Sequence, residues 1–258
     1  MQPAKIPSPP RFTEHLDIPA VLMRDPCYLE ILIPARNEAR RLPHTLMRTI
    51  QYLEKQQYSS SVVVVDNGSF DKTADVVVNA WSDRVPVRLT GCARPGKGAA
   101  VRRGILTSRA HFIGYMDADL ATPIETLDAV IPLLGASPAV VGSRRISGAS
   151  LARRQPVHRT MGSIVFRAMT QRVLRGLTDT QCGFKFFAGD LARTVACQLS
   201  IDGFAFDVEM LLAITEMGVA IKEIPVIWSD AKESTLHSLR DGTRAAADLY
   251  RLAHRRPT

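Results

Sequence analysis

The chain has 258 residues, of which 46% are hydrophobic and 22% charged, a composition typical of a soluble globular protein. Its net charge of +8 and pI near 9.6 favour anionic partners such as nucleotide sugars, lipid phosphates, nucleic acid or an acidic membrane. No basic run interleaved with aromatic residues is present, which argues against nucleic acid. The cysteines lack C-x-x-C spacing and fit a reduced cytoplasmic protein better than a disulfide framework.

The N-terminal segment is rich in proline and has no apolar core of the signal-peptide type. We expect a flexible arm over residues 1–27, followed by a single domain over 28–258. The most apolar longer stretch, 129–141, is interrupted by proline and glycine and is too short to span a bilayer. The sequence therefore predicts a cytoplasmic protein, or one bound peripherally at the cytoplasmic face of a membrane.

Strands and helices are expected to alternate through the first half of the chain. The hydrophobic pattern predicts strands at 29–33, 62–65, 85–89 and 112–116, and helices at 42–53, around 76–80 and at 97–109. The four consecutive valines at 62–65 suit a strand buried on both faces of a parallel sheet. This alternation predicts an α/β fold with a mostly parallel central sheet and helices on both of its faces.

The second half continues the α/β pattern with more irregular segments. A helix is expected from about Pro123, since proline is favoured in a first helical turn, and a basic loop over the site at 144–160. The other expected elements are strands at 139–141, 183–188 and 221–228, and helices at 161–169, 208–217 and 245–253.

Two carboxylates, Asp117 and Asp119, stand one residue apart at the end of the strand expected at 112–116. Because side chains alternate along a strand, both would point the same way. Like charges at that separation repel unless a cation lies nearby, and a hard divalent ion is the usual partner. Asp-x-Asp is also common in surface turns. Ligands of open α/β sheets, however, bind at the carboxyl ends of strands, so this context predicts a metal-assisted nucleotide site.

Several motifs, in order over residues 28–252, together resemble one family. Segments 33–38 (IPARNE), 66–73 (DNGSFDKT) and 117–119 (DAD) are similar to those of inverting family 2 glycosyltransferases, which have the GT-A fold. Segments 142–144 (GSR), 179–185 (DTQCGFK), 204–209 (FAFDVE) and 223–228 (EIPVIW) resemble the branch of dolichyl-phosphate glucosyltransferases and dolichol-phosphate mannose synthases. Ala121 stands where mannose synthases often have Gln, which favours the glucosyltransferase branch.

The resemblance implies a donor-nucleotide site. In it, Asp119 is a ligand of Mg²⁺ or Mn²⁺, and Asp117 lies near the ribose, the donor sugar or the metal. Lys97 touches the donor pyrophosphate or holds Asp117. The other residues implied in nucleotide binding are Pro34, Ala35, Arg36, Asn37, Glu38, Asp66, Gly68, Ser69 and Ala118. Taken singly, these segments also suit a helix cap or an ordinary turn.

The resemblance also implies an acceptor-phosphate site, formed by Arg144, Arg159, Gln181 and Lys185. Arginine forks suit phosphate oxygens, although a solvated charged loop is the alternative for the remaining arginines of 144–160. A phosphate acceptor is already ionised near neutral pH and needs no strong base. A hydroxyl or amine acceptor would need one, with Asp179, Asp207 and Glu209 as candidates. Asp207 and Glu209 equally suit the stabilising charge at a helix N-terminus.

The expected function is transfer of a hexose, with inversion, from a nucleotide sugar (a UDP-hexose) to a polyprenyl-phosphate-type acceptor, assisted by a divalent ion. An alternative keeps the donor but transfers to a soluble metabolite or a carrier-bound acceptor. A lesser alternative is a nucleotide-binding protein without catalysis, against which the intact Asp117 and Asp119 argue. The basic loop and the basic C-terminal end suit reversible contact with anionic lipid.

Overall fold

The computed structural model describes residues 27–151, 169–174, 176–229 and 238–254. The first half contains β1 (Leu29–Ala35), α1 (Leu42–Leu53), β2 (Ser60–Asp66), α2 (Thr73–Val78), β3 (Val87–Gly91), α3 (Lys97–Thr107), β4 (Phe112–Met116), the 3₁₀ turn η2 (Ile124–Thr126) and α4 (Leu127–Leu134). The second half contains β5 (Ala139–Ser143), β6 (Ser150–Leu151), β7 (Phe184–Ala188), α6 (Gly189–Ala196), α7 (Phe206–Glu216), β8 (Lys222–Pro225), β9 (Ile227–Trp228) and α8 (Ser238–Ala253).

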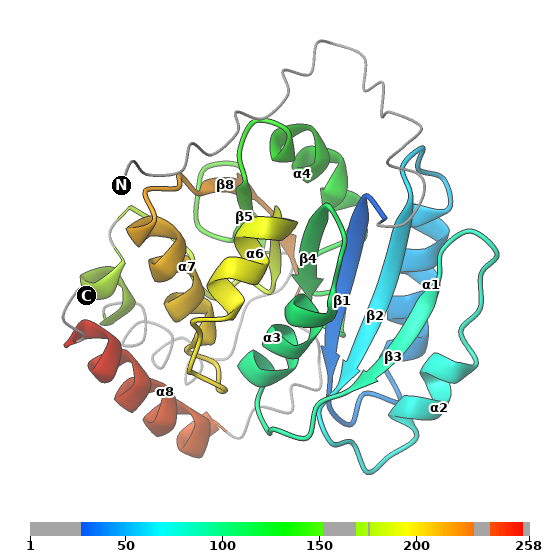
Figure 1. The fold of residues 1–258 in the computed structure, drawn as a ribbon, viewed down its shortest axis with the longest axis horizontal. Coiled ribbons are helices and arrows are strands. Elements are labelled where there is room, and N and C mark those ends of the chain that lie inside the picture. Colours follow the sequence, from blue (N-terminus) through cyan, green and yellow to red (C-terminus); the bar gives the residue numbers. More distant parts are fainter. Residues whose placement is uncertain (1–26, 152–168, 175, 230–237, 255–258) are drawn as a thin grey trace, which may run out of the picture.

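The main sheet has 7 strands in the order β3-β2-β1-β4-β7-β5-β8. Strand β7 is antiparallel to both of its neighbours, β4 and β5, whereas the other described pairs in this sheet are parallel. The expectation of a mostly parallel sheet is therefore confirmed. The parallel strands end at the lower edge of the sheet in Figure 1, so the loops that follow β1, β2 and β4 meet there.

Helices cover both faces of this sheet. Helices α3, α6 and α7 lie in front of it in Figure 1, and α1 lies behind it. The four valines of β2 show why: Val63 and Val65 belong to the hydrophobic cluster shared with α3, α6, α7 and α8, whereas Val62 and Val64 belong to the cluster shared with α1 and α4. Alternate side chains point to opposite faces, so an uninterrupted apolar strand serves both layers.

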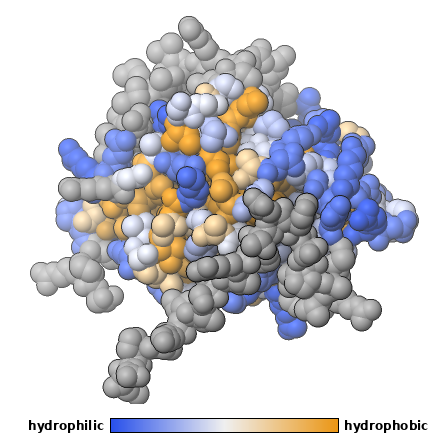
Figure 2. Space-filling view, turned by 90° about the horizontal axis from the view of Figure 1, so that it is seen from above, coloured by the Kyte–Doolittle hydropathy of each residue, from blue (hydrophilic) through white to orange (hydrophobic). Residues whose placement is uncertain are grey.

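The edge strand β3 is more polar than the central strands. Its side chains are mostly exposed, as suits a strand with one unpaired edge. Figure 2 views the molecule from above Figure 1, and hydrophilic residues predominate on its right, on the side of β2 and β3, while hydrophobic residues show across its centre. Among the described helices, none is both long and apolar enough to cross a bilayer.

Several boundaries differ from the sequence-based expectation. The strand expected at 85–89 lies at 87–91, and the helix expected at 245–253 begins at Ser238. The strand expected at 221–228 divides into β8 and β9, because the chain leaves β5 after Pro225 and pairs with β6. Helix α6 was not expected from the sequence. The arm 1–26, residues 152–160 of the basic loop and residues 161–168 of the next expected helix lie outside the described residues.

Candidate functional site

The candidate site lies where β1, β2 and β4 end and α3 begins. Strand β4 ends at Met116, so Asp117 and Asp119 lie in the turn that follows and not on the strand itself. The alternation of side chains along a strand therefore does not apply to them. They are nevertheless close enough for the charge of Asp117 to act on Asp119.

Asp117 is held from two sides. Its Oδ1 pairs with Nζ of Lys97, the first residue of α3, at 2.5 Å. Its backbone N–H donates to the Gly183 carbonyl at 3.1 Å. A Cβ at position 183 would lie 1.9 Å from Oδ2 of Asp117, so only glycine leaves room for the carboxylate. Of the two roles expected for Lys97, the structure shows the one in which it holds Asp117.

Asp119 is the more enclosed of the two carboxylates. Its Oδ1 accepts from the Ala121 N–H at 3.1 Å, and its Oδ2 lies 3.9 Å from Nη1 of Arg41. Burial, and secondly the charge of Asp117, raise the pKa of Asp119 above its usual value. The ionised form of Asp119 is thus incompletely compensated, which is the electrostatic condition that a bound cation relieves.

The oxygen donors of this site suit a hard divalent cation. The described residues contain no cluster of three or more His, Cys, Asp or Glu side chains arranged to hold a metal. A cation here would therefore take Asp119, with or without Asp117, from the protein and complete its shell with water or ligand oxygens. That arrangement is usual for ions shared with phosphate groups.

The loop after β1 is fixed against the loop after β2. The backbone N–H of Asn37 donates to Ser69 Oγ at 2.9 Å, and that of Glu38 donates to Thr73 Oγ1 at 2.8 Å. Asn37 has φ of +57°, a conformation that Asn tolerates better than most residues. Asp66 accepts from the Ser69 N–H at 3.1 Å. The expected nucleotide-binding segments therefore form one connected surface.

Glu38 is buried beside Arg41. The guanidinium donates from Nε to Oε2 at 2.7 Å and from Nη2 to Oε1 at 2.5 Å. Burial raises the pKa of Glu38, and the Arg41 hydrogen bonds oppose that rise. Since Arg41 also approaches Asp119, it lies between the expected nucleoside and metal positions.

Other expected donor-site residues differ in exposure. Arg36 is exposed, Pro34 is half-buried and Ala35 is buried. Gly68 has φ of +73°, a conformation that glycine adopts without strain. The Ala118 carbonyl accepts from Thr45 Oγ1 at 2.6 Å, which fixes the turn between the two aspartates.

The half-buried Arg144 forms an ion pair with the buried Asp179. Asp179 Oδ2 accepts from Arg144 Nε at 2.6 Å and from its backbone N–H at 3.0 Å, while Oδ1 accepts from Nη2 at 2.9 Å. Burial alone would raise the pKa of Asp179, but the hydrogen bonds and charge of Arg144 lower it to about 2. The guanidinium also lies 5.4 Å from the Trp228 ring centroid, a cation–π contact. Arg144 is thus fixed in orientation.

Lys185, Asp207 and Glu209 are turned away from solvent. Lys185 is fully buried and pairs with Asp207 at 2.5 Å. Glu209 accepts from the backbone N–H groups of Ser200 and Ile201 and so fixes that loop. This burial argues against Lys185 as a phosphate ligand and against Asp207 and Glu209 as bases. Gln181 is half-buried, and Arg159 lies outside the described residues.

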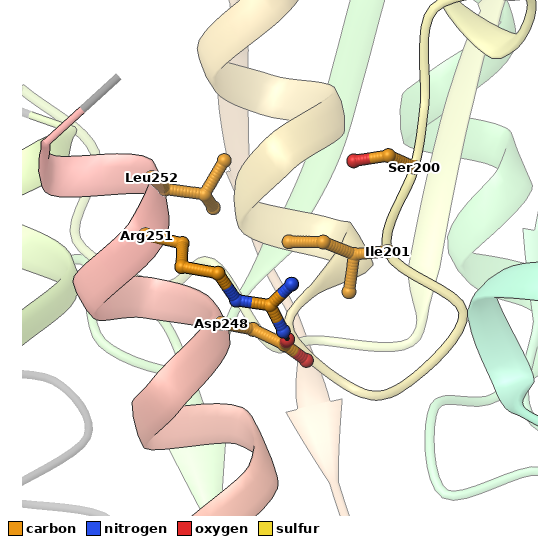
Figure 3. A pocket seen from close by; sticks show the side chains of 5 residues that line it. All are labelled: Ser200, Ile201, Asp248, Arg251 and Leu252. Atoms are coloured by element: carbon orange, nitrogen blue, oxygen red, sulfur yellow. Dashed lines mark hydrogen bonds and ion pairs between the residues drawn. The ribbon is translucent and has the colours of Figure 1, made fainter.

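A cavity of about 190 Å³ lies at a different place, between α8 and the loop before α7. Figure 3 shows Leu252 and Arg251 of α8 facing Ile201 across it, with Asp248 beside the arginine. None of the residues that line it belongs to the expected donor or acceptor site.

Sequence reasoning missed three residues that shape the site: Arg41, Asn67 and Glu223. Asn67 Nδ2 donates to the Arg94 carbonyl at 2.7 Å and its Oδ1 accepts from the Gly96 N–H at 2.7 Å, which places the start of α3. Glu223 accepts from the backbone N–H groups of Thr178 and Asp179. Asn67 and Glu223 stand within the motifs that carry the family resemblance but were given no role. Arg41 had a different local signal, because it follows Glu38 at the i, i+3 spacing of a helical ion pair.

Comparisons with known proteins identify a matching family and similar relatives. The family model "Glycosyl transferase family 2" matches residues 30–189. A dolichyl-phosphate beta-glucosyltransferase of Trichomonas vaginalis is 31% identical over 96% of this chain and 76% of its own length. The dolichyl-phosphate beta-glucosyltransferase of Homo sapiens is 34% identical over 81% of this chain and 69% of its own length.

Among solved structures, glucosyl-3-phosphoglycerate synthase from Mycobacterium tuberculosis is similar in fold. In its complex with Mn²⁺, UDP-glucose and phosphoglyceric acid, it aligns with a TM-score of 0.69 and 16% identity, over 90% of this chain and 82% of that one. The likeness confirms the GT-A fold expected from the sequence.

The Arg144–Asp179 pair predicts a pH-dependent stability. The pKa of Asp179 falls from 3.8 to about 2 on folding, so its stabilisation is fully present above pH 3.8 and is lost as the pH falls through about 2. We expect Asp179→Asn to lower the free energy of unfolding by about 2 kcal/mol at neutral pH, measured by urea denaturation. Asp190→Asn, in the exposed pair with Arg193, is the control and should change little; equal losses in both variants would contradict the assignment.

Proposed function

The chain belongs to glycosyltransferase family 2, and on this basis we propose that it transfers a hexose, with inversion, from a UDP-sugar to a polyprenyl phosphate with the help of a divalent cation. Use of a nucleotide sugar follows from the family. The identity of the nucleotide base, the use of a divalent cation and the identity of the acceptor are proposed. Relatives named dolichyl-phosphate beta-glucosyltransferases support the acceptor and the sugar.

One observation carries the proposal: a carboxylate pair and a fixed arginine lie within electrostatic reach of each other. The Asp117 N–H donates to the carbonyl of Gly183 at 3.1 Å, four residues after Asp179, the partner of Arg144. Asp179 raises the pKa of Arg144 against the effect of burial, and the charge of Asp117 adds to that rise. A site for a cation and a diphosphate thus lies near a cation fit for a second phosphate group. Transfer between a nucleotide sugar and a lipid phosphate requires that proximity.

On the donor side, the connected loops after β1 and β2 would hold the base and ribose, through the segments Pro34–Glu38 and Asp66–Ser69. Asp117 and Ala118 would face the ribose and sugar, and Lys97 adds positive charge at the start of α3. Asp119 would hold Mg²⁺ or Mn²⁺. When bound, such an ion stabilises the negative charge of the departing diphosphate without proton transfer.

On the acceptor side, the lack of a suitable base among the candidates favours a phosphate. Asp179 is committed to Arg144 and its pKa is about 2, so it accepts a proton poorly near neutral pH. Asp207 and Glu209 are buried and satisfied. A phosphate acceptor is already ionised and requires no strong base. Arg144 would hold it, with Gln181 beside the pair and Arg159 as a second proposed ligand.

We also propose peripheral contact with an anionic membrane at its cytoplasmic face. Helix α8 exposes Arg244 and Arg251, and its Tyr250 is 61% exposed. Cationic and aromatic side chains of this kind suit a lipid headgroup region, where each cation contributes about 1 kcal/mol. Such contact would bring the chain to a lipid-borne acceptor.

The direct test of the function is a donor screen with product mass spectrometry. The full chain is incubated with UDP- and GDP-hexoses and Mn²⁺, with and without polyprenyl phosphate in anionic vesicles. We expect a polyprenyl-phosphate hexose from the UDP-sugar, and flotation of the protein with the vesicles at low salt. Transfer to a soluble acceptor alone, without vesicle binding, would refute the lipid acceptor.

Asp119 is expected to be indispensable. Asp119→Ala should lower turnover at least ~100-fold, the scale on which a main electrostatic stabiliser acts, and EDTA should have a similar effect on the wild-type enzyme. Asp128→Ala, which removes an exposed carboxylate bound to Tyr52, is the control. Full activity of Asp119→Ala, or of the enzyme in EDTA, would refute the metal assignment.

Arg144 is expected to act on the acceptor and not on the donor. Arg144→Gln should cost about 1.5–3 kcal/mol in kcat/KM for the acceptor, since it removes a charge-assisted contact, and should leave UDP affinity nearly unchanged. Asp179 keeps its backbone donors in this variant. The matched control is Arg145→Gln at the neighbouring exposed position. An equal loss of UDP affinity would place Arg144 in the donor site instead.

A further inference from the structure

A buried ion pair joins strand β7 to helix α7. Lys185 of β7 has 0% exposure and Asp207 of α7 has 2%, and their Nζ and Oδ1 atoms are 2.5 Å apart. Replacing a buried ion pair by well-packed apolar residues is often neutral or stabilising. Stability alone therefore does not account for this pair, and a positional role is the stronger explanation.

The pair is connected by further hydrogen bonds to two neighbouring elements. Asp207 Oδ1 accepts from the Tyr115 hydroxyl at 2.5 Å. Lys185 Nζ donates to the Cys182 carbonyl at 2.5 Å. Tyr115 and Lys185 are also direct partners in the β4–β7 register. The pair thus ties α7 to the last residues of β4 and to the backbone that leads into β7.

The Cys182 carbonyl belongs to the peptide unit that continues into Gly183. This unit is planar, so a hydrogen bond to its oxygen also fixes the orientation of the Gly183 N–H and Cα. Gly183 in turn accepts from the Asp117 N–H at 3.1 Å, and its missing side chain leaves the space that the Asp117 carboxylate fills. Lys185 therefore acts on Asp117 through the Cys182–Gly183 peptide unit and the Gly183 carbonyl that follows it.

Asp207 acts on the same carboxylate through Lys185. Its Oδ1 accepts from the Lys185 Nζ at 2.5 Å, and that ammonium also donates to the Cys182 carbonyl. Asp207 thus holds the group that fixes the segment beside Asp117. Neither partner of the buried pair has the exposure needed to touch a substrate directly in this structure.

We infer that Lys185 and Asp207 are positioning residues that set the Asp117 carboxylate for donor binding, and that neither is a phosphate ligand or a general base. This inference rests on the proposed donor site at Asp117. The pair belongs to the second half of the chain, whereas the proposed nucleotide site is built mainly by the first half. Lys185 and Asp207 would thus support a site formed by distant parts of the sequence.

The test is calorimetric titration of the full chain with UDP in the presence of Mn²⁺. The double variant Lys185→Met/Asp207→Leu replaces the pair by apolar side chains of similar length. We expect it to retain the thermal midpoint of the wild type but to bind UDP with Mn²⁺ at least ~10-fold more weakly, as is usual when a supporting residue of a metal site is lost. In turnover, the KM for the donor should rise and the acceptor KM should stay unchanged.

The matched control is Glu30→Leu/Arg88→Met, which removes another pair with a buried carboxylate. Glu30 lies near the start of β1, at the opposite end of the strand from the site. This variant should bind UDP like the wild type. An equal loss of affinity in both double variants, or wild-type affinity in the folded Lys185→Met/Asp207→Leu protein, would overturn the inference.

A milder variant decides the matter if the double variant does not fold. Tyr115→Phe removes only the hydroxyl that binds Asp207, and we expect about threefold weaker UDP binding, the effect of one hydrogen bond; unchanged affinity would overturn the inference. Wild-type protein that binds no UDP with Mn²⁺ would refute the proposed function and the inference with it. Binding by the wild type with unchanged variants would refute the inference alone.

Discussion

The repulsion between two neighbouring carboxylates, Asp117 and Asp119, is the constraint on which the rest of the site depends. Asp117 is compensated by Lys97, whereas burial and the charge of Asp117 keep the pKa of Asp119 raised although the Arg41 guanidinium lies 3.9 Å away. Because the charge of Asp119 is less well compensated than that of Asp117, a further positive charge beside Asp119 would be stabilising. The loops after β1 and β2, the start of α3 and the glycine before β7 all serve to keep the two carboxylates in place.

The reversed strand β7 links the proposed donor and acceptor sites. Because β7 runs antiparallel between β4 and β5, its beginning lies beside the end of β4, where Asp117 follows. The segment before β7 carries Asp179, which orients Arg144 after β5. A parallel strand at this position would place that segment at the opposite edge of the sheet. The single reversal therefore brings Asp179 to the edge of the sheet where Arg144 and the carboxylate pair lie.

The sequence was informative where the signal is local, and less so where it depends on tertiary contacts. Local sequence patterns predicted three features: the valine strand with both faces buried, the strand at 112–116 and the carboxylate pair that follows it. The roles of Lys185 and Asp207 were not, because nothing local shows that two charges 22 residues apart neutralise each other in the core. The same holds for Asn67 and Glu223, whose partners are backbone groups of distant loops. The strand expected at 221–228 is divided because β9 pairs with β6. Strand β6 consists of Ser150–Leu151 and is too short to recognise in the sequence.

We propose that the edge formed by β1, β2 and β4 is a cation-dependent site for a UDP-sugar. Calorimetric titration of the full chain with UDP-glucose and with GDP-mannose, each with and without Mn²⁺, tests this proposal. We expect UDP-glucose to bind at least ~10-fold more tightly than GDP-mannose, a difference of about 1.4 kcal/mol, and to require the cation. Tighter binding of GDP-mannose, or equal affinity for UDP-glucose without Mn²⁺, would contradict it.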